Sequence, residues 1–292
     1  MSHKALSILN LIVTLFFIAW NGISQTGMIY DQNIGDLSAK YDNLFTPASY
    51  AFSIWGLIFL MLLAYSIYQV KHAFRIGVGR SKVTPSPTSA SADPGTSLPS
   101  PRLQEFDFIK ATGLWYAIGT FICGAWIHFW LTEQLIGSLV CMFATLVCLL
   151  VIVIKTRMEL DDRSMGIIAF VWWPICIFSG WITVASIANM SAVLDAYGFS
   201  WGYTETTWTL IMIVVAVAVN ILMITQRNMR EFAAVGMWAL FAIYLRHANG
   251  NESVAQWALG GTMVLLVIAG LHAYRNRATL PHVKLKQRFA DN

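Results

Sequence analysis

Long apolar segments, each about as long as a bilayer is thick, constrain this chain more than any other feature. A helix that crosses a membrane needs about 20 mostly apolar residues, and only 12% of the 292 residues are charged, about half the share in soluble domains. We therefore predict an all-α, polytopic membrane helix bundle with about eight transmembrane helices. The predicted spans are 5–23, 48–71, 109–131, 134–155, 165–188, 206–226, 231–247 and 254–274.

The basic residues predict how this bundle lies in the bilayer. Of the 19 Lys and Arg, only Lys40 and Arg246 fall in the odd-numbered connections between spans, and Lys110 lies at the start of the third span. The others lie in the even-numbered connections and the two ends of the chain. Because positive residues stay on the cytoplasmic side, we expect an integral, multi-pass protein of the plasma (inner) membrane with both termini cytoplasmic.

The spans divide into a group of five and a group of three. We expect a five-helix membrane core over 1–194, an additional three-helix membrane segment over 195–274, and a basic cytoplasmic tail over 275–292. The core is interrupted at 77–105, where five of the eight prolines stand among Ser, Thr and Ala. Such a composition cannot form a packed core, so we expect a disordered cytoplasmic linker there.

The side chains that carry most enzyme and ion-transport chemistry are missing from the spans. No Asp or Glu lies well inside one, whereas ion-coupled transporters usually need such groups. His128 is the only histidine well within a span, and the four cysteines form no CxxC pair. Nucleotide-binding, metalloprotease and hydrolase motifs are absent. We therefore expect a protein that is not an enzyme, with no catalytic residue, metal, cofactor or nucleic-acid partner.

The tryptophans gather toward the predicted outer side. Aromatic belts normally anchor both interfaces of a membrane, so this lopsided pattern leaves two explanations open: a one-sided belt, or an aromatic cavity that opens outward under the 24–47 connection. Such a cavity would suit a large, flat apolar ligand held by stacking and burial. The tryptophans in the outer half of the first five spans are Trp20, Trp55, Trp126, Trp130 and Trp181.

The start of the second span resembles a known membrane family. The tryptophan-rich sensory protein, or translocator protein, family (TspO/MBR) has the signature W-x-P-P-x-W-x-F-x-x-x-W here, after a long loop. In this chain the stretch 45–55 reads FTPASYAFSIW. Phe45 and Tyr50 stand at the first two tryptophan positions, Ala48 replaces the second proline, and Trp55 comes one residue early.

The fifth span matches the same family in register, since its pattern W-x-x-x-A-[TS]-x-x-N is present as WITVASIAN over 181–189. In the third span, the family's N-x-x-W keeps Trp126 but has Cys123 at the Asn position. The resemblance covers about 5–194 and leaves the last three spans outside. It implies a five-helix bundle, frequent homodimers, and a pocket under the first outer loop that binds porphyrins, other tetrapyrroles or sterol-like lipids. The ligand-binding residues that it implies are Tyr50, Phe52, Trp55, Trp126, Trp181, Ala185 and Asn189.

Several functions remain open from the sequence. The leading hypothesis is an integral membrane, receptor-like binding protein for a flat hydrophobic ligand such as a tetrapyrrole or a sterol-like lipid. The alternative is a membrane permease or transporter for a small hydrophobic solute, because eight helices suit a transporter better than five do. A light- or oxygen-dependent degradation of bound porphyrin, and a scaffold that recruits partners through its linker and tail, are two further hypotheses.

Overall fold

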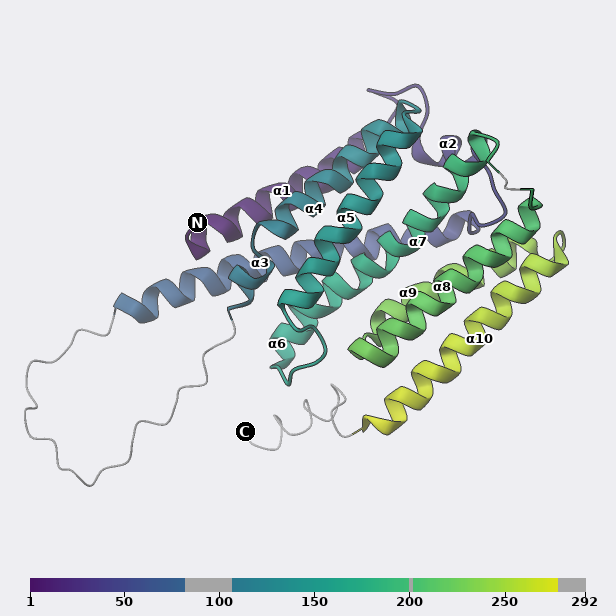
Figure 1. The fold of residues 1–292 in the computed structure, drawn as a ribbon. Helices are drawn as coiled ribbons and strands as arrows, with labels where there is room; N and C mark the ends of the chain where they lie inside the picture. The colour runs from purple at the N-terminus through teal and green to yellow at the C-terminus, as the bar shows by residue number, and fades with distance from the viewer. Residues whose placement is uncertain (82–106, 200–201, 278–292) are drawn as a thin grey trace, which may run out of the picture.

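The computed structural model describes residues 1–81, 107–199 and 202–277, which are mostly helical and include no strand. Seven helical segments in this part of the chain are long and apolar enough to cross a membrane, so the predicted all-α membrane bundle is confirmed (Figure 1). The elements are α1 (His3–Ser24), α2 (Ile34–Lys40), η1 (Ser49–Ser53), α3 (Ile54–Ser81), α4 (Phe108–Leu131), α5 (Leu135–Lys155), α6 (Met165–Ile167), η2 (Ile168–Trp172), α7 (Trp173–Ala196), α8 (Glu205–Arg227), α9 (Arg230–His247) and α10 (Glu252–Arg275).

One of the eight predicted spans, 231–247, does not reach the length and apolar character of the others. It forms α9, which has 18 residues and carries Arg230, Glu231 and Arg246 near its ends. α9 packs against α7, α8 and α10, and much of its surface is therefore covered by protein. A helix that is shielded in this way can be shorter and more polar than one that faces lipid.

The ends of the helices lie at two opposite ends of the bundle. α1 begins and α10 ends at the same end (Figure 1), as an even number of passes requires. The connections α1–α3, α4–α5, α7–α8 and α9–α10 gather at the other end, which we call the loop end. The assignment of the loop end to the outer side of the membrane rests on the distribution of basic residues.

Two helix boundaries differ from the predicted ones. α3 continues to Ser81, so residues 77–81 of the predicted linker are helical, whereas 82–105 lie outside the described residues. The fifth span, predicted over 165–188, continues to Ala196 and contains a π-helical turn, η2, just before Pro174. Proline removes a backbone donor and its ring crowds the preceding turn, which accounts for the wider winding at this point. Residues 278–292 of the predicted tail also lie outside the described part.

Glycines allow the last three helices to pack closely on the first five and on each other. A Cβ atom added at Gly180 of α7 would lie 2.9 Å from the carbonyl oxygen of Phe232 on α9. One added at Gly236 of α9 would lie 2.5 Å from the side-chain amide of Asn220 on α8. Real side chains do not approach so closely, so these glycines fix the position of α9 between α7 and α8.

Candidate functional site

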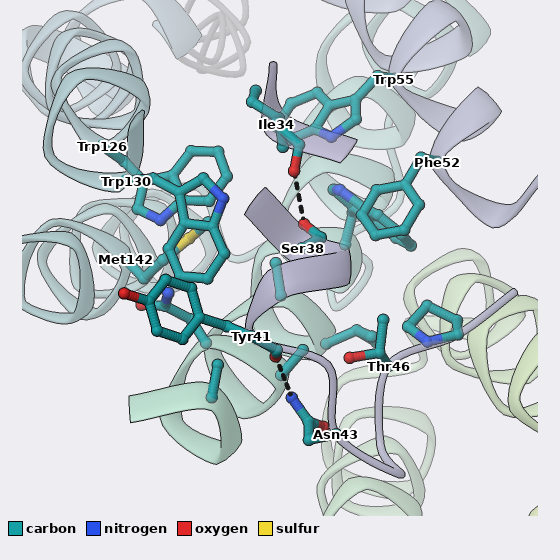
Figure 2. A pocket seen from close by; sticks show the side chains of 17 residues that line it. Ile34, Ser38, Tyr41, Asn43, Thr46, Phe52, Trp55, Trp126, Trp130 and Met142 are labelled. Atoms are coloured by element: carbon teal, nitrogen blue, oxygen red, sulfur yellow. Dashed lines mark hydrogen bonds between the residues drawn. The ribbon is translucent and has the colours of Figure 1, made fainter. Parts of the chain in front are cut away.

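A cavity with mostly apolar walls, rich in aromatic side chains, lies under the segment that joins α1 to α3 (Figure 2). We call this segment, residues 25–53, the lid; it contains α2 and η1. α3, α4, α5 and α7 form the rest of the wall, and the cavity volume is about 70 Å³. Small side chains of α7, including Ala185, Ala188 and Ala192, leave this space open. The aromatic residues of the wall are Tyr41, Phe52, Trp55, Trp126, Trp130 and Trp181.

The structure brings six of the seven predicted ligand-binding residues together at this cavity, and places the seventh outside it. Tyr50 lies on the outer side of η1, is 38% exposed, and packs edge-on against Trp238 of α9 with 5.2 Å between ring centroids. Its neighbour Ala51 is fully buried, so the η1 turn directs Tyr50 away from the cavity. The six residues at the cavity are Phe52, Trp55, Trp126, Trp181, Ala185 and Asn189.

The aromatic rings form two groups that face each other across the cavity (Figure 2). On α4, Trp126 and Trp130 are stacked, with 5.9 Å between centroids and planes 16° apart. On the other side Phe52 and Trp55 each meet Trp181 of α7 edge-on, at 5.7 Å and 6.4 Å. Two aromatic walls with a narrow space between them are suited to a flat ring that stacks on one wall and meets ring edges on the other.

Several buried polar atoms at the cavity have no hydrogen-bond partner. They are the indole Nε1 atoms of Trp126, Trp130 and Trp181, and each of these side chains is at least nine-tenths buried. An indole nitrogen can only donate, and leaving a buried donor unpaired costs about 1–3 kcal/mol. All three donors belong to side chains that line the cavity, and the nitrogen atoms themselves are covered by protein.

Asn189, the polar residue of the fifth-span motif, differs from these indoles because its amide is already bonded. Its Nδ2 donates to Ser138 Oγ on α5 at 3.2 Å, and its Oδ1 accepts from the same hydroxyl at 3.3 Å. Asn189 therefore joins α7 to α5 behind the cavity and presents little free polar surface to a ligand.

A second, wider compartment adjoins the aromatic cavity. Its volume is about 680 Å³, and it lies between the lid, the loop end of α1 and α9. Phe52 and Trp55 line both spaces, so a ligand in the wide compartment would touch the aromatic wall. Polar side chains surround the wide compartment, in contrast to the inner cavity. They include Asn21, Gln25, Asp42 and Arg246.

The α2 side of the lid is fixed to the α4–α5 turn by one carboxylate, that of Glu133. Lys40 Nζ lies 2.5 Å from Glu133 Oε2, the Tyr41 hydroxyl donates to the same oxygen at 2.5 Å, and Gln32 Nε2 donates to Oε1 at 3.3 Å. These donors lower the pKa of Glu133, the hydrogen bond from Lys40 most strongly. The bond to Glu133 in turn raises the pKa of Tyr41 to about 12.

The family comparison covers nearly the whole chain. The model of a family described as TSPO-like protein matches residues 7–271. The chain belongs to the TSPO-like family. The family match continues well past residue 194, where the resemblance in the sequence motifs ends, and therefore includes the last three helices. No curated protein and no solved structure matches the chain.

His128 and the four cysteines, which were considered in the sequence as possible functional residues, do not line the aromatic cavity. His128 is exposed, and its Nδ1 lies 2.8 Å from the Tyr30 hydroxyl of the lid. The four cysteines are buried and unpaired, and the described residues contain no group of three or more His, Cys, Asp or Glu that could hold a metal ion. These side chains are consistent with packing roles within the TSPO-like fold.

Two aromatic wall residues, Trp130 and Tyr41, were not among the predicted site residues. Trp130 is four residues after Trp126, and this spacing, which places both rings on one helix face, was the signal for it. Tyr41 lies at the end of α2 and packs on Trp130 with 5.9 Å between centroids. No spacing in the sequence relates a residue of the lid to α4. The position of Tyr41 in the cavity wall is therefore seen only in the folded structure.

Proposed function

We propose that this TSPO-like membrane protein is a receptor-like binding protein for a flat hydrophobic ligand, a porphyrin or other tetrapyrrole or a sterol-like lipid, at the aromatic site under the lid. The observation that carries the proposal is the pair of facing aromatic walls, with unpaired indole donors, beside a compartment of about 680 Å³. Compartments of this size, within roughly 300–1,000 Å³, are typical of sites for small molecules.

The size of the two spaces indicates where such a ligand would lie. The inner cavity, at about 70 Å³, is far below the volume of a tetrapyrrole, whereas the wide compartment is large enough for most of one. A ring bound in the wide compartment would stack on Phe52 and Trp55. Deeper insertion, between Trp126 and Trp181, would require the lid to move outward.

The indole donors favour a ligand that carries acceptor oxygens over a pure hydrocarbon. A carboxylate or carbonyl group would accept from Trp126, Trp130 or Trp181 and would remove the cost of the unpaired donors. Tetrapyrroles with carboxylate side chains combine such acceptors with a flat ring, so we favour them among the flat hydrophobic ligands.

Titration of the purified protein with protoporphyrin IX, followed through the Soret absorbance, tests the proposal. Trp181→Ala removes a ring and an indole donor, so we expect the affinity to fall by about tenfold or more. Trp126→Phe keeps a ring and removes only the N–H group, so the affinity should fall a few-fold, by about 1 kcal/mol. Trp257→Ala is the matched control, since Trp257 is 51% exposed on α10. Unchanged affinity in both Trp55→Ala and Trp181→Ala would contradict the aromatic site.

Passage of a small hydrophobic solute is the second candidate, and a buried polar seam between α1, α3 and α4 favours it. Thr14 Oγ1 lies 2.8 Å from Ser66 Oγ and 2.7 Å from the Tyr116 hydroxyl, and Asn10 Nδ2 donates to Gln69 Oε1 at 2.9 Å. Polar groups inside a membrane are costly and are often functional. Uptake of porphyrin into proteoliposomes distinguishes the two functions. For a binding protein, the amount taken up is proportional to the amount of protein. For a permease, it is proportional to the internal volume of the vesicles.

A further inference from the structure

We infer that α8 and α9 act as a latch that holds the lid closed over the site, and that Arg246 is the residue that positions it; this inference rests on the proposed binding function. The part of the lid concerned is residues 42–51, which we call the strap. The strap leads from the end of α2 into η1, and its residues line both the inner cavity and the wide compartment.

Arg246, in the last turn of α9, binds the strap at three points. Its Nη1 donates to the carbonyl oxygens of Asn43 at 2.9 Å and Thr46 at 2.7 Å, and its Nη2 forms an ion pair with Asp42. A planar guanidinium with several donors in fixed directions can serve three acceptors at once, which a lysine ammonium on a flexible chain does less well. The side chain of Arg246 is 24% exposed and that of Asp42 is 50% exposed, so solvent screens the ion pair, and the bonds to the two carbonyl oxygens are the better protected ones.

The peptide groups of Leu44 are held by side chains from two different helices. His247 Nε2 of α9 lies 2.9 Å from the Leu44 carbonyl oxygen; since a carbonyl only accepts, this nitrogen is the donor. Glu205 Oε1, in the first turn of α8, accepts from the Leu44 backbone N–H at 3.1 Å. The centre of the strap therefore depends on α8 and α9 together.

The contact with α9 continues to the other end of the strap. The backbone N–H of Ala48 donates to the carbonyl oxygen of Ala242 at 3.2 Å, and Trp238 Nε1 donates to the carbonyl oxygen of Ala51 at 3.1 Å. The ring of Tyr50 also packs edge-on against Trp238. The strap thus follows α9 from Arg246 to Trp238, and its backbone groups are bonded to a helix outside the five-helix core.

These bonds control the access to the aromatic site. Thr46 and Pro47 of the strap are walls of both spaces, and Arg246 itself lines the wide compartment. Because the inner cavity is too small for the proposed ligand, the lid must move before a ring can stand between the aromatic walls. The polar contacts of Arg246, His247 and Glu205 with the strap oppose this movement, so release of the strap sets how fast a ligand enters.

Hydrogen exchange of the full-length protein in lipid nanodiscs tests the latch without any ligand. In Arg246→Gln, we expect the Leu44, Phe45 and Ala48 amides to exchange about tenfold faster or more, because the strap loses its hydrogen bonds to a charged side chain. Amides in the middle of α7 should keep their rates. Arg275→Gln, at an exposed position of α10, is the matched control and should leave the strap unchanged. Equal exchange of the strap in wild type and Arg246→Gln would overturn the inference.

Stopped-flow mixing with protoporphyrin IX then tests the gating. We expect the association rate to rise in Arg246→Gln, because the latch opposes the lid movement that lets a ring enter between the aromatic walls. Faster strap exchange with unchanged rates would overturn the gating role. Faster exchange with no porphyrin bound by any variant, wild type included, would instead support the latch and contradict the proposed function.

A second variant keeps the test valid if Arg246→Gln fails to fold. Trp238→Phe keeps an aromatic ring and removes only the N–H donor to Ala51, so it should loosen the η1 end of the strap by a smaller factor. A strap that exchanges as in wild type in Trp238→Phe would count against α9 as its support. Near-ultraviolet circular dichroism of each variant checks that the bundle is intact.

Discussion

At the scale of single residues, Glu133 holds the α2 side of the lid. Its carboxylate accepts from Tyr41 and Gln32 and pairs with Lys40, and its backbone adopts a left-handed conformation with φ 56° that few non-glycine residues adopt. The lid is therefore fastened at both sides, by Glu133 near α4 and by Arg246 on α9. The two attachments differ in chemistry, since all the acceptors at Glu133 belong to one ionisable carboxylate, whereas Arg246 also donates to the backbone carbonyl oxygens of Asn43 and Thr46.

This difference predicts that acid loosens the α2 side of the lid. The donors around Glu133 lower its pKa, so the attachment is complete above the ordinary carboxyl pKa and is lost as the pH falls through the lowered value. A spin label at Ala39→Cys reports the motion of α2, and the four native cysteines are buried. We expect the label to become more mobile below about pH 4.

Two variants control this acid experiment. Glu133→Gln keeps an acceptor for Tyr41 but cannot titrate, so its label should be more mobile at neutral pH and should change little on acidification. Asp31→Asn removes an exposed carboxyl elsewhere in the lid and should retain the wild-type profile. A Glu133→Gln label with the wild-type pH dependence would assign the effect to another group.

At the scale of elements, the position of α9 determines that of the strap, and Gly180 determines the position of α9. A Cβ atom at Gly180 would lie 2.9 Å from Phe232 O and 3.1 Å from Val235 Cβ. Two of the three closest atoms are backbone, so α9 as a whole must shift to relieve the contact.

We therefore expect Gly180→Ala to destabilise the bundle by about 1–3 kcal/mol, as overpacked interiors do, despite the better helix propensity of alanine. Thermal unfolding in detergent measures the effect. Gly260→Ala is the matched control, because a Cβ at Gly260 on α10 meets nothing within 4 Å; it should be neutral or slightly stabilising, by up to about 1 kcal/mol. Equal melting temperatures for the two variants would show that α9 can shift away from Gly180 with no loss of stability.

The elements themselves were largely predictable from the sequence, because each helix that faces lipid must be long and apolar. Seven of the eight predicted spans meet that condition in the structure. α9 is the exception for a physical reason: neighbouring helices cover it, so its own composition is less constrained. Residue-level orientation was less predictable, as Tyr50 illustrates, since a single turn of η1 decides whether it faces the cavity or Trp238.

At the scale of the whole molecule, the fold brings together residues that are far apart in the chain. Arg246 and Asp42 are separated by 204 positions, and Glu205 and Leu44 by 161. No local pattern relates such pairs, so the sequence indicated the aromatic walls through family motifs but not the latch. Both Lys40 and Arg246, the two basic residues in the odd-numbered connections, prove to be bonded within the lid region.

The distance along the chain between the strap and α9 also has a consequence for biosynthesis. α1 to α7 are synthesised before α9, so the residues of both aromatic walls are present while the strap still lacks its partners. Only after residue 247 has left the ribosome can His247 and Arg246 bind the strap. Contacts between distant parts of a chain form late in folding, and a nascent protein therefore passes through a stage in which its aromatic site is open to the surrounding lipids.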